Sequence, residues 1–280
     1  MKFVRFGNPG AEKPGLIDND GHIRDLSDQV DDLAGASLDP DRLARLGKLD
    51  QEKLPLVGND VRIAAPVGDI RQVVCIGLNY SDHAAELGMP LPAEPVIFLK
   101  SPYAITGPFD DIAMPPGSTK TDWEIELTIV IGRKAEEINR ADAMKHIAGF
   151  TIMNDISERA WQLEGTGQWT KGKSYRGFAP LGPWLVTPDD ITDVQNLHMW
   201  LDVDKERMQE GSTKTMIFDV GHMVAFVSER ITLMPGDIIA TGTPPGVGSG
   251  MKPPRFLKPG SNLTFGIEGL GEQRHKMVGG

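Results

Sequence analysis

Glu124 and Glu126 stand two positions apart in an otherwise apolar and β-branched run, TDWEIELTIVIG (residues 121–132). Because successive side chains of a β-strand point to opposite faces, two residues at this spacing share one face of a sheet. Two carboxylates side by side on a half-buried face repel each other and lose hydration, which is costly unless they gain a partner or a proton. A bound cation removes both costs, so we interpret the pair as part of a metal site.

Asp155 is the best candidate for a third ligand. It ends the strand-like run GFTIMND (149–155) and stands where the next helix is expected to begin. Three carboxylates suit a hard cation such as Mg²⁺ or Mn²⁺, with waters or substrate completing an octahedron. Zn²⁺ fits less well, because no histidine or cysteine lies near these carboxylates in the sequence.

The segment after Asp155, ISERAWQLEG (156–165), is expected to be helical. Asp155, Arg159 and Gln162 are then spaced i, i+4 and i+7 on one helical face. Arg159 could pair with Asp155 or with a substrate carboxylate, and Gln162 could orient a water or a carbonyl group. Taken alone, these residues are equally compatible with an ordinary N-terminal aspartate and a helical salt bridge.

His83 and Glu86 form a second candidate pair. They lie three residues apart on a short helix expected over Ser81–Leu87, with Ser81 as its N-cap and Gly88 at its end. A carboxylate beside an imidazole fixes its tautomer and raises its basicity, which suits a general base that acts on water. The alternative interpretation is a surface contact between two polar side chains.

Residues 167–174, GQWTKGKS, match the phosphate-binding pattern G-x-x-x-x-G-K-[ST]. Such a loop needs a strand before it and a helix after it. Here a helical segment precedes it, and the Gly- and Pro-rich run YRGFAPLGP (175–183) follows. We therefore interpret Lys173 as a positioned cation that faces an anionic substrate.

The loop ATGTPPGVGSG (240–250) is too rich in glycine and proline for regular structure. It follows the strand-like run GDIIAT, so its backbone N–H groups and the hydroxyls of Thr241 and Thr243 could bind a carboxylate. A plain connection after a strand is the alternative.

These candidate residues need a scaffold, and the sequence predicts one that is mostly β-structure. Glycine (32 residues) and proline (21) are both above average usage, and strand-like runs outnumber helical ones. Because the connections are too short for regular βαβ units, we expect an α+β, β-rich fold with a mixed β-roll or barrel-like catalytic domain. Strands are expected at 73–77, 96–99, 124–131, 149–153, 183–187, 197–203, 237–241 and 262–267, and helices at 81–87, 142–148, 156–164 and 221–228.

The first part of the chain has the features of a separate small unit. Short strands around MKFVRF and GLIDNDGHIRDL, with an Asn-Asp-Gly turn, precede the polar helical stretch DPDRLARLGKL. We place the boundary near residue 68, with a small N-terminal α/β domain over 1–68 and the catalytic domain over 69–280.

Composition limits the classes of partner. The net charge of −10 argues against nucleic acid and anionic membrane surfaces. The N-terminus has no apolar targeting segment, and no stretch approaches the length of a membrane span. Cys75 is the single cysteine, which excludes an intrachain disulfide, and its apolar neighbours favour a buried thiol. We expect a cytoplasmic protein that acts on a small molecule.

Together, these residues resemble the fumarylacetoacetate hydrolase family over about residues 70–270. Five motifs in consistent order carry the resemblance: GLNYSDHAAE (77–86), WEIELTIVIG (123–132), NDISERAWQ (154–162), KGKS (171–174) and ATGTPPGVG (240–248). The resemblance implies a mixed β-roll catalytic domain, a small N-terminal domain, a homodimer and a bound Mg²⁺ or Mn²⁺ ion.

By motif position, the resemblance also implies roles for nine residues. They are the metal ligands Glu124, Glu126 and Asp155, the dyad His83 and Glu86 on a mobile lid segment, the lysine Lys173, the polar pair Arg159 and Gln162, and the carboxylate-binding Thr243.

The chain also departs from parts of the family pattern. Acylpyruvase-like members often have arginine where this chain has Leu78, and the GLNY form resembles the subgroup that acts on 2,4-diketo-3-deoxy sugar acids. Residues 175–180 (YRGFAP) replace the Asp-Thr-Phe-Gly-Pro-like stretch of many members of that subgroup, so contacts to the distal part of the substrate are expected to differ.

The expected activity is metal-dependent hydrolysis of a carbon–carbon bond in a 2,4-diketo acid, either a 2,4-diketo-3-deoxy sugar acid or an acylpyruvate, with release of pyruvate. His83, oriented by Glu86, would deprotonate a water that attacks the 4-oxo carbon, and the metal and Lys173 would stabilise the pyruvate enolate.

Other activities fit the same residues. The site could decarboxylate oxaloacetate, which needs the metal and Lys173 but not the dyad, or act as a hydratase or isomerase of 2-oxo-enoic diacids. From a different class, the acidic cluster could be a structural cation site in a non-enzymatic or nucleotide-binding protein. That alternative predicts metal-dependent stability without turnover.

Overall fold

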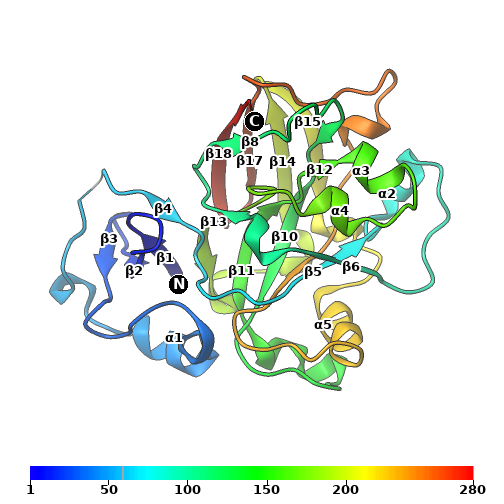
Figure 1. Cartoon of the computed structure of the whole chain (residues 1–280). Coiled ribbons are helices and arrows are strands. Elements are labelled where there is room, and N and C mark those ends of the chain that lie inside the picture. The colour runs from blue at the N-terminus through cyan, green and yellow to red at the C-terminus, as the bar shows by residue number, and fades with distance from the viewer. Residues whose placement is uncertain (59, 280) are drawn as a thin grey trace.

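The polypeptide folds into an α+β, β-rich structure, as the sequence predicts (Figure 1). The computed structural model describes residues 1–58 and 60–279. Each of the eight expected strands overlaps a strand of the structure, and the segment 73–77 matches at both ends.

An 11-stranded sheet forms the centre of the molecule. Its strands run in the order β3-β2-β1-β13-β11-β10-β16-β5-β6, while β4 pairs with β1 and β7 pairs with β13 outside this path. Their bounds are β1 Lys2–Phe6, β2 Lys13–Ile17, β3 Ile23–Asp25, β4 Ile63–Ala64, β5 Val73–Gly77, β6 Val96–Lys100, β7 Ile105–Thr106, β10 Ile125–Ile131, β11 Ile147–Asn154, β13 Ala179–Val186 and β16 Ile238–Ala240.

A second, five-stranded sheet has the order β15-β14-β17-β18-β8 and packs against β10 and β13 of the central sheet. A two-stranded pair, β12 with β9, completes the β-structure. The bounds are β8 Ile112–Ala113, β9 Thr121–Asp122, β12 Ser157–Glu158, β14 His198–Val203, β15 Glu206–Ser212, β17 Asn262–Ile267 and β18 Gly271–Val278.

Five short α-helices lie around the sheets. They are α1 Pro40–Leu46, α2 Ser81–Glu86, α3 Arg159–Leu163, α4 Thr170–Lys173 and α5 Val220–Ser228. In Figure 1, α2, α3 and α4 lie on the same side of the molecule, whereas α5 lies at the opposite end of β10 and β11.

The helix predictions need three corrections. The N-cap of α2 is Tyr80 rather than Ser81, whose hydroxyl donates instead to the carbonyl oxygen of Thr215. The helix expected over 156–164 begins only at Arg159, because the residues just before it pair with β9 as strand β12. The helix expected over 142–148 is a 3-10 helix over Arg140–His146, and β11 follows it directly.

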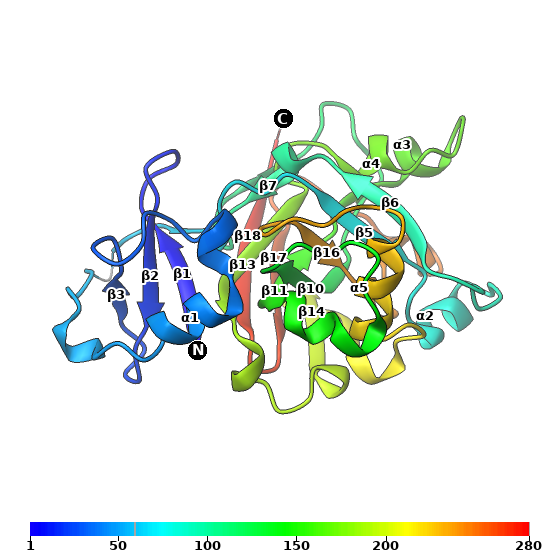
Figure 2. The same cartoon turned by 90° about the horizontal axis from the view of Figure 1, so that it is seen from below.

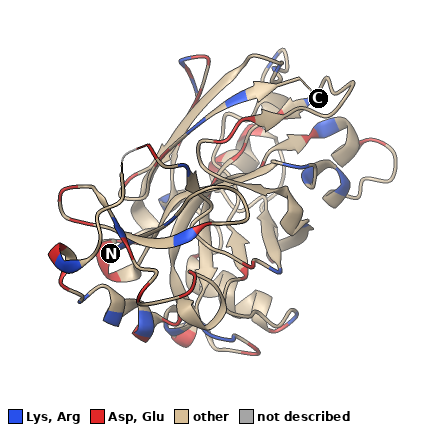
Figure 3. Ribbon diagram, turned by 60° about the vertical axis from the view of Figure 1, so that its left-hand side comes forward, with Lys and Arg blue, Asp and Glu red and all other residues tan. Residues whose placement is uncertain are grey.

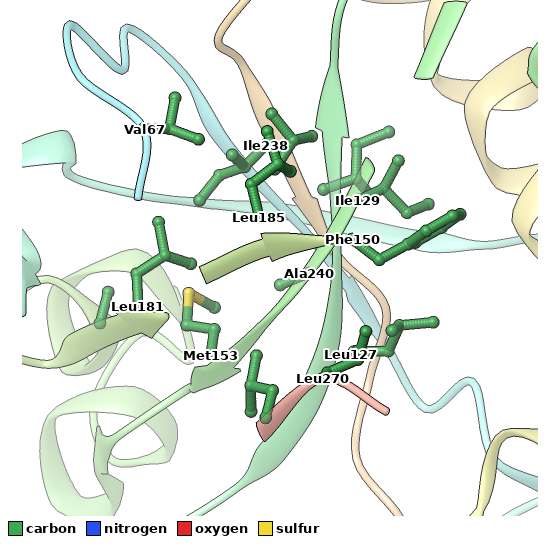
Figure 4. Packing of buried hydrophobic residues seen from close by; sticks show 14 of the residues in the cluster. Val67, Leu127, Ile129, Phe150, Met153, Leu181, Leu185, Ile238, Ala240 and Leu270 are labelled. Atoms are coloured by element: carbon green, nitrogen blue, oxygen red, sulfur yellow. The ribbon is translucent and has the colours of Figure 1, made fainter. Parts of the chain in front are cut away.

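The hydrophobic core lies where β10, β11, β13 and β16 meet. Every residue of β10 is buried, which explains why its sequence is an almost unbroken β-branched run. Figure 4 shows Ile129 of β10 beside Phe150 of β11, with Leu185 of β13 and Ile238 of β16 close by. Glu126 on β10 and Glu124 just before it are therefore anchored on a deeply buried strand pair.

The N-terminal segment forms its own small group of strands with α1, beside the larger part of the molecule (Figures 1 and 2). The two parts share the central sheet, since β1 pairs with β13 through Lys2–Val186 and Phe3–Leu185. The division near residue 68 stays a prediction.

Charged residues of both signs are distributed over the strands, helices and loops (Figure 3). Among the described residues, no helix has the length and apolar character needed to cross a membrane.

Candidate metal centre and active site

The carboxylates of Glu124, Glu126 and Asp155 come together as a buried cluster. Each offers one oxygen, and these oxygens all lie within 4.8 Å of one another. The sheet register explains the meeting: Ile125 at the start of β10 pairs with Asn154 at the end of β11, so Asp155 lies beside Glu124. The backbone N–H of Asp155 donates to the carbonyl oxygen of Glu124 at 2.8 Å.

Two lysines hold Asp155 and one of them also holds Glu124. Lys173 Nζ lies 2.6 Å from Asp155 Oδ2 and 2.7 Å from Glu124 Oε2. Lys100 Nζ lies 2.5 Å from Asp155 Oδ1 and donates to the carbonyl oxygen of Ile156 at 3.1 Å. Lys173 is at the end of the short helix α4 rather than in an open loop, and its side chain is almost completely buried.

Arg159 links a further aspartate to the cluster. Its Nε lies 2.8 Å from Asp122 Oδ2, its Nη2 lies 2.6 Å from Glu124 Oε1, and its Nη1 donates to Gln162 Oε1 at 2.9 Å. Arg159 and Gln162 are thus neighbours on α3, as their spacing predicts. Asp155, which precedes β12, is not on that helix, so the expected pairing of Arg159 with Asp155 is replaced by pairing with Asp122 and Glu124.

Glu124 and Glu126 sit in opposite electrostatic environments. Burial alone would raise the pKa of Glu124, but Arg159 and Lys173 outweigh it and lower the pKa to about 2. Burial and the neighbouring charges of Asp155 and Glu124 raise the pKa of Glu126 well above its ordinary value. In the described part of the chain, Glu126 receives one hydrogen bond, from the backbone N–H of Gly242 at 2.8 Å.

The cluster therefore fits a divalent cation. Glu126 is a buried carboxylate that faces two others and has no ion-pair partner among the described residues, and all three offer hard oxygen donors. Mg²⁺ and Mn²⁺ prefer such donors. A cation placed among them would supply the positive counter-charge that a buried, ionised Glu126 needs.

His83 and Glu86 form the dyad that their spacing predicts. His83 Nδ1 lies 2.9 Å from Glu86 Oε2, and the other carboxylate oxygen of Glu86 accepts from the backbone N–H of Gly246 at 2.9 Å. Because the carboxylate can only accept, it fixes the tautomer with the proton on Nδ1, so Nε2 carries the lone pair that a base needs. His83 is buried and lines the same cavity as Glu124 and Glu126.

The loop after β16 meets the site at Thr243. Its hydroxyl lies 2.9 Å from the carbonyl oxygen of Ile125 and 2.8 Å from Nε2 of Gln209. Thr241 donates to the carbonyl oxygen of Leu127 and does not line the cavity, so it is not available to a ligand.

The backbone N–H groups of this loop are directed at protein carboxylates rather than at an open anion site. Gly242 and Gly246 donate to Glu126 and Glu86, and Gly248 and Ser249 donate to Asp122. The expectation that these N–H groups bind a substrate carboxylate is therefore wrong for these four.

A cavity of about 370 Å³ joins these groups. It is lined by Ile76, Gly77, Leu78, His83, Leu87, Met89, Phe98, Glu124, Glu126, Arg159, Gln162, Leu163, Trp169, Lys173, Gly242, Thr243, Val247 and Ser249. Seven of the nine residues singled out from the sequence line it. The other two, Asp155 and Glu86, lie behind the wall in contact with Lys173 and His83.

Sequence reasoning missed three buried residues that organise the site. Lys100 pairs with Asp155, Asp122 pairs with Arg159, and Gln209 accepts from the backbone of Ile125 while donating to Thr243. Asp122 could have been found, because it stands two residues before Glu124 in the same run. Nothing local to Lys100 or Gln209 indicates that they reach the site.

Comparison with known proteins agrees with this arrangement. A family model described as "Fumarylacetoacetate (FAA) hydrolase C-terminal" matches residues 72–278. A relative from Burkholderia multivorans is 54% identical over 98% of this chain and 97% of its own length, and its name gives the class hydrolase without a substrate.

Solved structures of the same fold cover the whole chain. Fumarylacetoacetate hydrolase from Exiguobacterium antarcticum is 36% identical, with a TM-score of 0.88 and full coverage of both chains. A 2-hydroxyhepta-2,4-diene-1,7-dioate isomerase from Mycobacterium marinum is 33% identical over 98% of its chain, with a TM-score of 0.76. Maleylpyruvate hydrolase from Sphingobium sp. SYK-6, in complex with manganese(II) and pyruvate, is 26% identical over its full length, with a TM-score of 0.83.

Proposed function

Because the chain belongs to the fumarylacetoacetate hydrolase family, we propose that it is a metal-dependent hydrolase that cleaves a carbon–carbon bond in a 2,4-diketo acid and releases pyruvate. One observation carries the proposal: the same cavity contains a buried cluster of metal-ligating carboxylates, a buried lysine and a histidine–glutamate base. Hydrolysis of a diketo acid needs all three, whereas a structural cation site needs the carboxylates alone.

Glu124, Glu126 and Asp155 would hold the metal ion, Mg²⁺ or Mn²⁺. When bound, such an ion supplies Lewis acidity toward the carboxylate and 2-oxo group of the substrate. The related maleylpyruvate hydrolase, which was solved with manganese(II) and pyruvate, supports this choice of ion and product.

His83 would activate the water. Its Nε2 takes a proton from a water molecule while Nδ1 stays bonded to Glu86, and the resulting hydroxide forms a bond to the 4-oxo carbon. The carbon 3–carbon 4 bond then breaks, and its electron pair moves into the pyruvate enolate. Carbon 4 leaves as a carboxylic acid, and protonation of carbon 3 yields pyruvate.

Lys173 would stabilise the enolate. Burial opposes its charge, but Asp155 and Glu124 outweigh that effect and raise the pKa of Lys173. The ammonium group therefore stays protonated at neutral pH, and it is already oriented at the place where negative charge develops. Gln162 and Thr243, which also line the cavity, would position the acid end of the substrate.

Two other activities use the same enolate. Decarboxylation of oxaloacetate needs no water-derived nucleophile, and an isomerase of 2-oxo-enoic diacids moves protons without cleavage. The geometry of His83 and Glu86 favours hydrolysis over decarboxylation, since an oriented base with a free lone pair suits proton removal from water and decarboxylation needs no such base.

The test is pyruvate release from 2,4-dioxopentanoate with Mg²⁺ or Mn²⁺ present. Glu126→Gln and a chelator should each abolish release, and release that survives both would contradict the metal assignment. His83→Ala should remove hydrolysis while sparing oxaloacetate decarboxylation. His198→Ala, which changes an exposed histidine far from the cavity, is the matched control and should leave both activities unchanged.

A further inference from the structure

We propose that the site takes 2,4-diketo acids whose distal group is uncharged, and that it discriminates against a second carboxylate at that end. This inference rests on the proposed function, because it identifies the distal end from the reacting carbons. It concerns the apolar side chains that line the cavity, here called the distal wall, which we assign to the end of the substrate that is not held by the carboxylate cluster.

The distal wall of the cavity is apolar. Its side chains come from several separate segments of the chain: Ile76, Leu78, Leu87, Met89, Phe98, Leu163, Trp169 and Val247. Among the described residues that line the cavity, the lysine and arginine side chains are Lys173 and Arg159, and both already contact buried carboxylates. A substrate carboxylate on the apolar wall would therefore lose its hydration without meeting a counter-charge.

Aromatic packing makes this wall a specific structure. Phe98 and Trp169 meet edge to face, with 5.3 Å between their ring centroids. Trp169 can approach β5 so closely because residue 77 is glycine, where a Cβ atom would lie 2.6 Å from the ring. Lys173 Nζ lies 5.0 Å from the centroid of Phe98, so this ring stands at the border between the charged and apolar parts of the cavity.

The polar groups near the wall do not favour a distal carboxylate on the substrate either. His83 is engaged with Glu86, and Gln162 accepts from Arg159, while Ser249 and Thr243 are neutral. Glu86 adds negative charge behind His83, which repels an anion. Structural relatives named for a 1,7-dioate act, by those names, on compounds with two carboxylates. The distal wall of this chain is apolar, so we expect it to disfavour a second carboxylate.

A matched pair of substrates isolates the distal group. Hydrolysis of 2,4-dioxoheptanoate by one water gives pyruvate and butanoate, and hydrolysis of 2,4-dioxoheptanedioate gives pyruvate and succinate. The two substrates differ only by a methyl group against a carboxylate at carbon 7. With the Mn²⁺-loaded protein, we expect kcat/KM for the monoacid to exceed that for the diacid by at least about tenfold, a difference of about 1.4 kcal/mol. Equal or faster release from the diacid overturns the inference.

Ligand binding tests the inference without turnover. Calorimetric titration with 2-oxoheptanoate and 2-oxoheptanedioate, which lack the 4-oxo group, should show at least about tenfold tighter binding of the monoacid. If this preference holds but no diketo acid releases pyruvate, the proposed hydrolysis fails and the inference about the wall stands. Tighter or equal binding of the diacid contradicts the inference whether or not hydrolysis occurs.

Leu163→Lys adds a positive charge to the wall at a position that is more than half exposed, so the fold should accept it. We expect the variant to have a higher kcat/KM for 2,4-dioxoheptanedioate than the wild type. The ratio of kcat/KM for the monoacid to that for the diacid should fall at least threefold. Leu163→Met is the matched control, since methionine has a similar unbranched shape without the charge, and it should keep the wild-type preference. A Lys variant with an unchanged preference would place the distal group elsewhere.

Discussion

Lys100 and Asp155 form an ion pair from which water is fully excluded, with 2.5 Å between Nζ and Oδ1 and no exposed surface on either side chain. Lys173 holds the other carboxylate oxygen of Asp155. The aspartate that follows β11 is therefore fixed from both sides before any ligand arrives. Lys100 does not line the cavity, so we assign it a positioning role rather than a catalytic one.

Lys100→Met should destabilise the protein strongly. Removing one member of a buried pair typically costs about 3–5 kcal/mol, and here it leaves Asp155 to share Lys173 with Glu124. Urea denaturation at neutral pH measures the change in the free energy of unfolding. Lys145→Met removes an exposed lysine that pairs with Asp142, and this control should cost no more than about 1 kcal/mol. Similar losses of unfolding free energy in the two variants would show that the buried Lys100–Asp155 pair stabilises the fold no more than an exposed pair does.

Glu126 should make the metal-free protein less stable as pH rises. Its pKa in the fold is well above the ordinary value of 4.5, because burial and then Asp155 and Glu124 oppose its charge. Above that ordinary value the unfolded chain releases the proton while the folded chain keeps it, so the stabilisation present at lower pH is lost as pH rises toward the folded pKa.

Unfolding measured with a chelator present, from about pH 5 to about pH 8, checks this sign. Glu126→Gln removes the titrating group. The free energy of unfolding of this variant, relative to that of the wild type, should therefore increase as pH rises. Adding Mn²⁺ should raise the melting temperature of the wild type but not that of Glu126→Gln, so that the wild type becomes the more stable of the two proteins. Glu136→Gln, at an exposed position, should behave like wild type in both experiments. A wild-type protein whose melting temperature ignores Mn²⁺ would argue against a metal at this cluster.

Gly77→Ala should disturb the distal wall. The added Cβ would lie 2.6 Å from Trp169, so the indole must move or the strand must shift. Overpacking of this kind costs about 1–3 kcal/mol, and tryptophan fluorescence should report the displaced ring. Gly58→Ala is the control, because a Cβ there meets no atom within 4 Å. Unchanged fluorescence and stability in Gly77→Ala would mean that the ring packs less tightly than described.

Cys75 should be inert in the folded protein. It is fully buried, and burial, followed by the charges of Asp155 and Glu126, raises the pKa of its thiol well above the ordinary value. The reactive thiolate is therefore scarce and shielded, so labelling by a thiol reagent at about pH 8 should be at least about a thousandfold slower than in urea. Rapid labelling without denaturant would show that β5 opens locally.

Much of the site could be predicted because its residues form recognisable patterns within short stretches of the sequence. Glu124 and Glu126 lie in an apolar run, and Asp155 closes a strand-like segment, so each stands out from its neighbours. His83 and Glu86 are three residues apart on one short helix and need no distant partner to be recognised. The same reasoning located the β-rich fold, since β5, β10 and β11 are made largely of apolar residues.

The parts that were missed depend on contacts between distant segments. Lys100 and Asp155 are 55 positions apart, and no local feature of VIFLK shows that the lysine turns inward. The strands β15 and β18 were not predicted, because they are polar at alternate positions and their apolar content is low. The start of α3 was placed too early, because pairing of β12 with β9 overrides local helix propensity.

Glu86 contacts two separate segments, accepting from His83 on α2 and from the backbone of Gly246 in the loop after β16. Under the proposed mechanism, separation of α2 from that loop would remove the oriented base, while Lys173 and the carboxylate cluster would keep their places. Hydrolysis would stop, and enolate chemistry that needs no water could continue. Under that mechanism the hydrogen bond between Glu86 and Gly246, with the other contacts that hold α2, would set the partition between two reactions that share one intermediate.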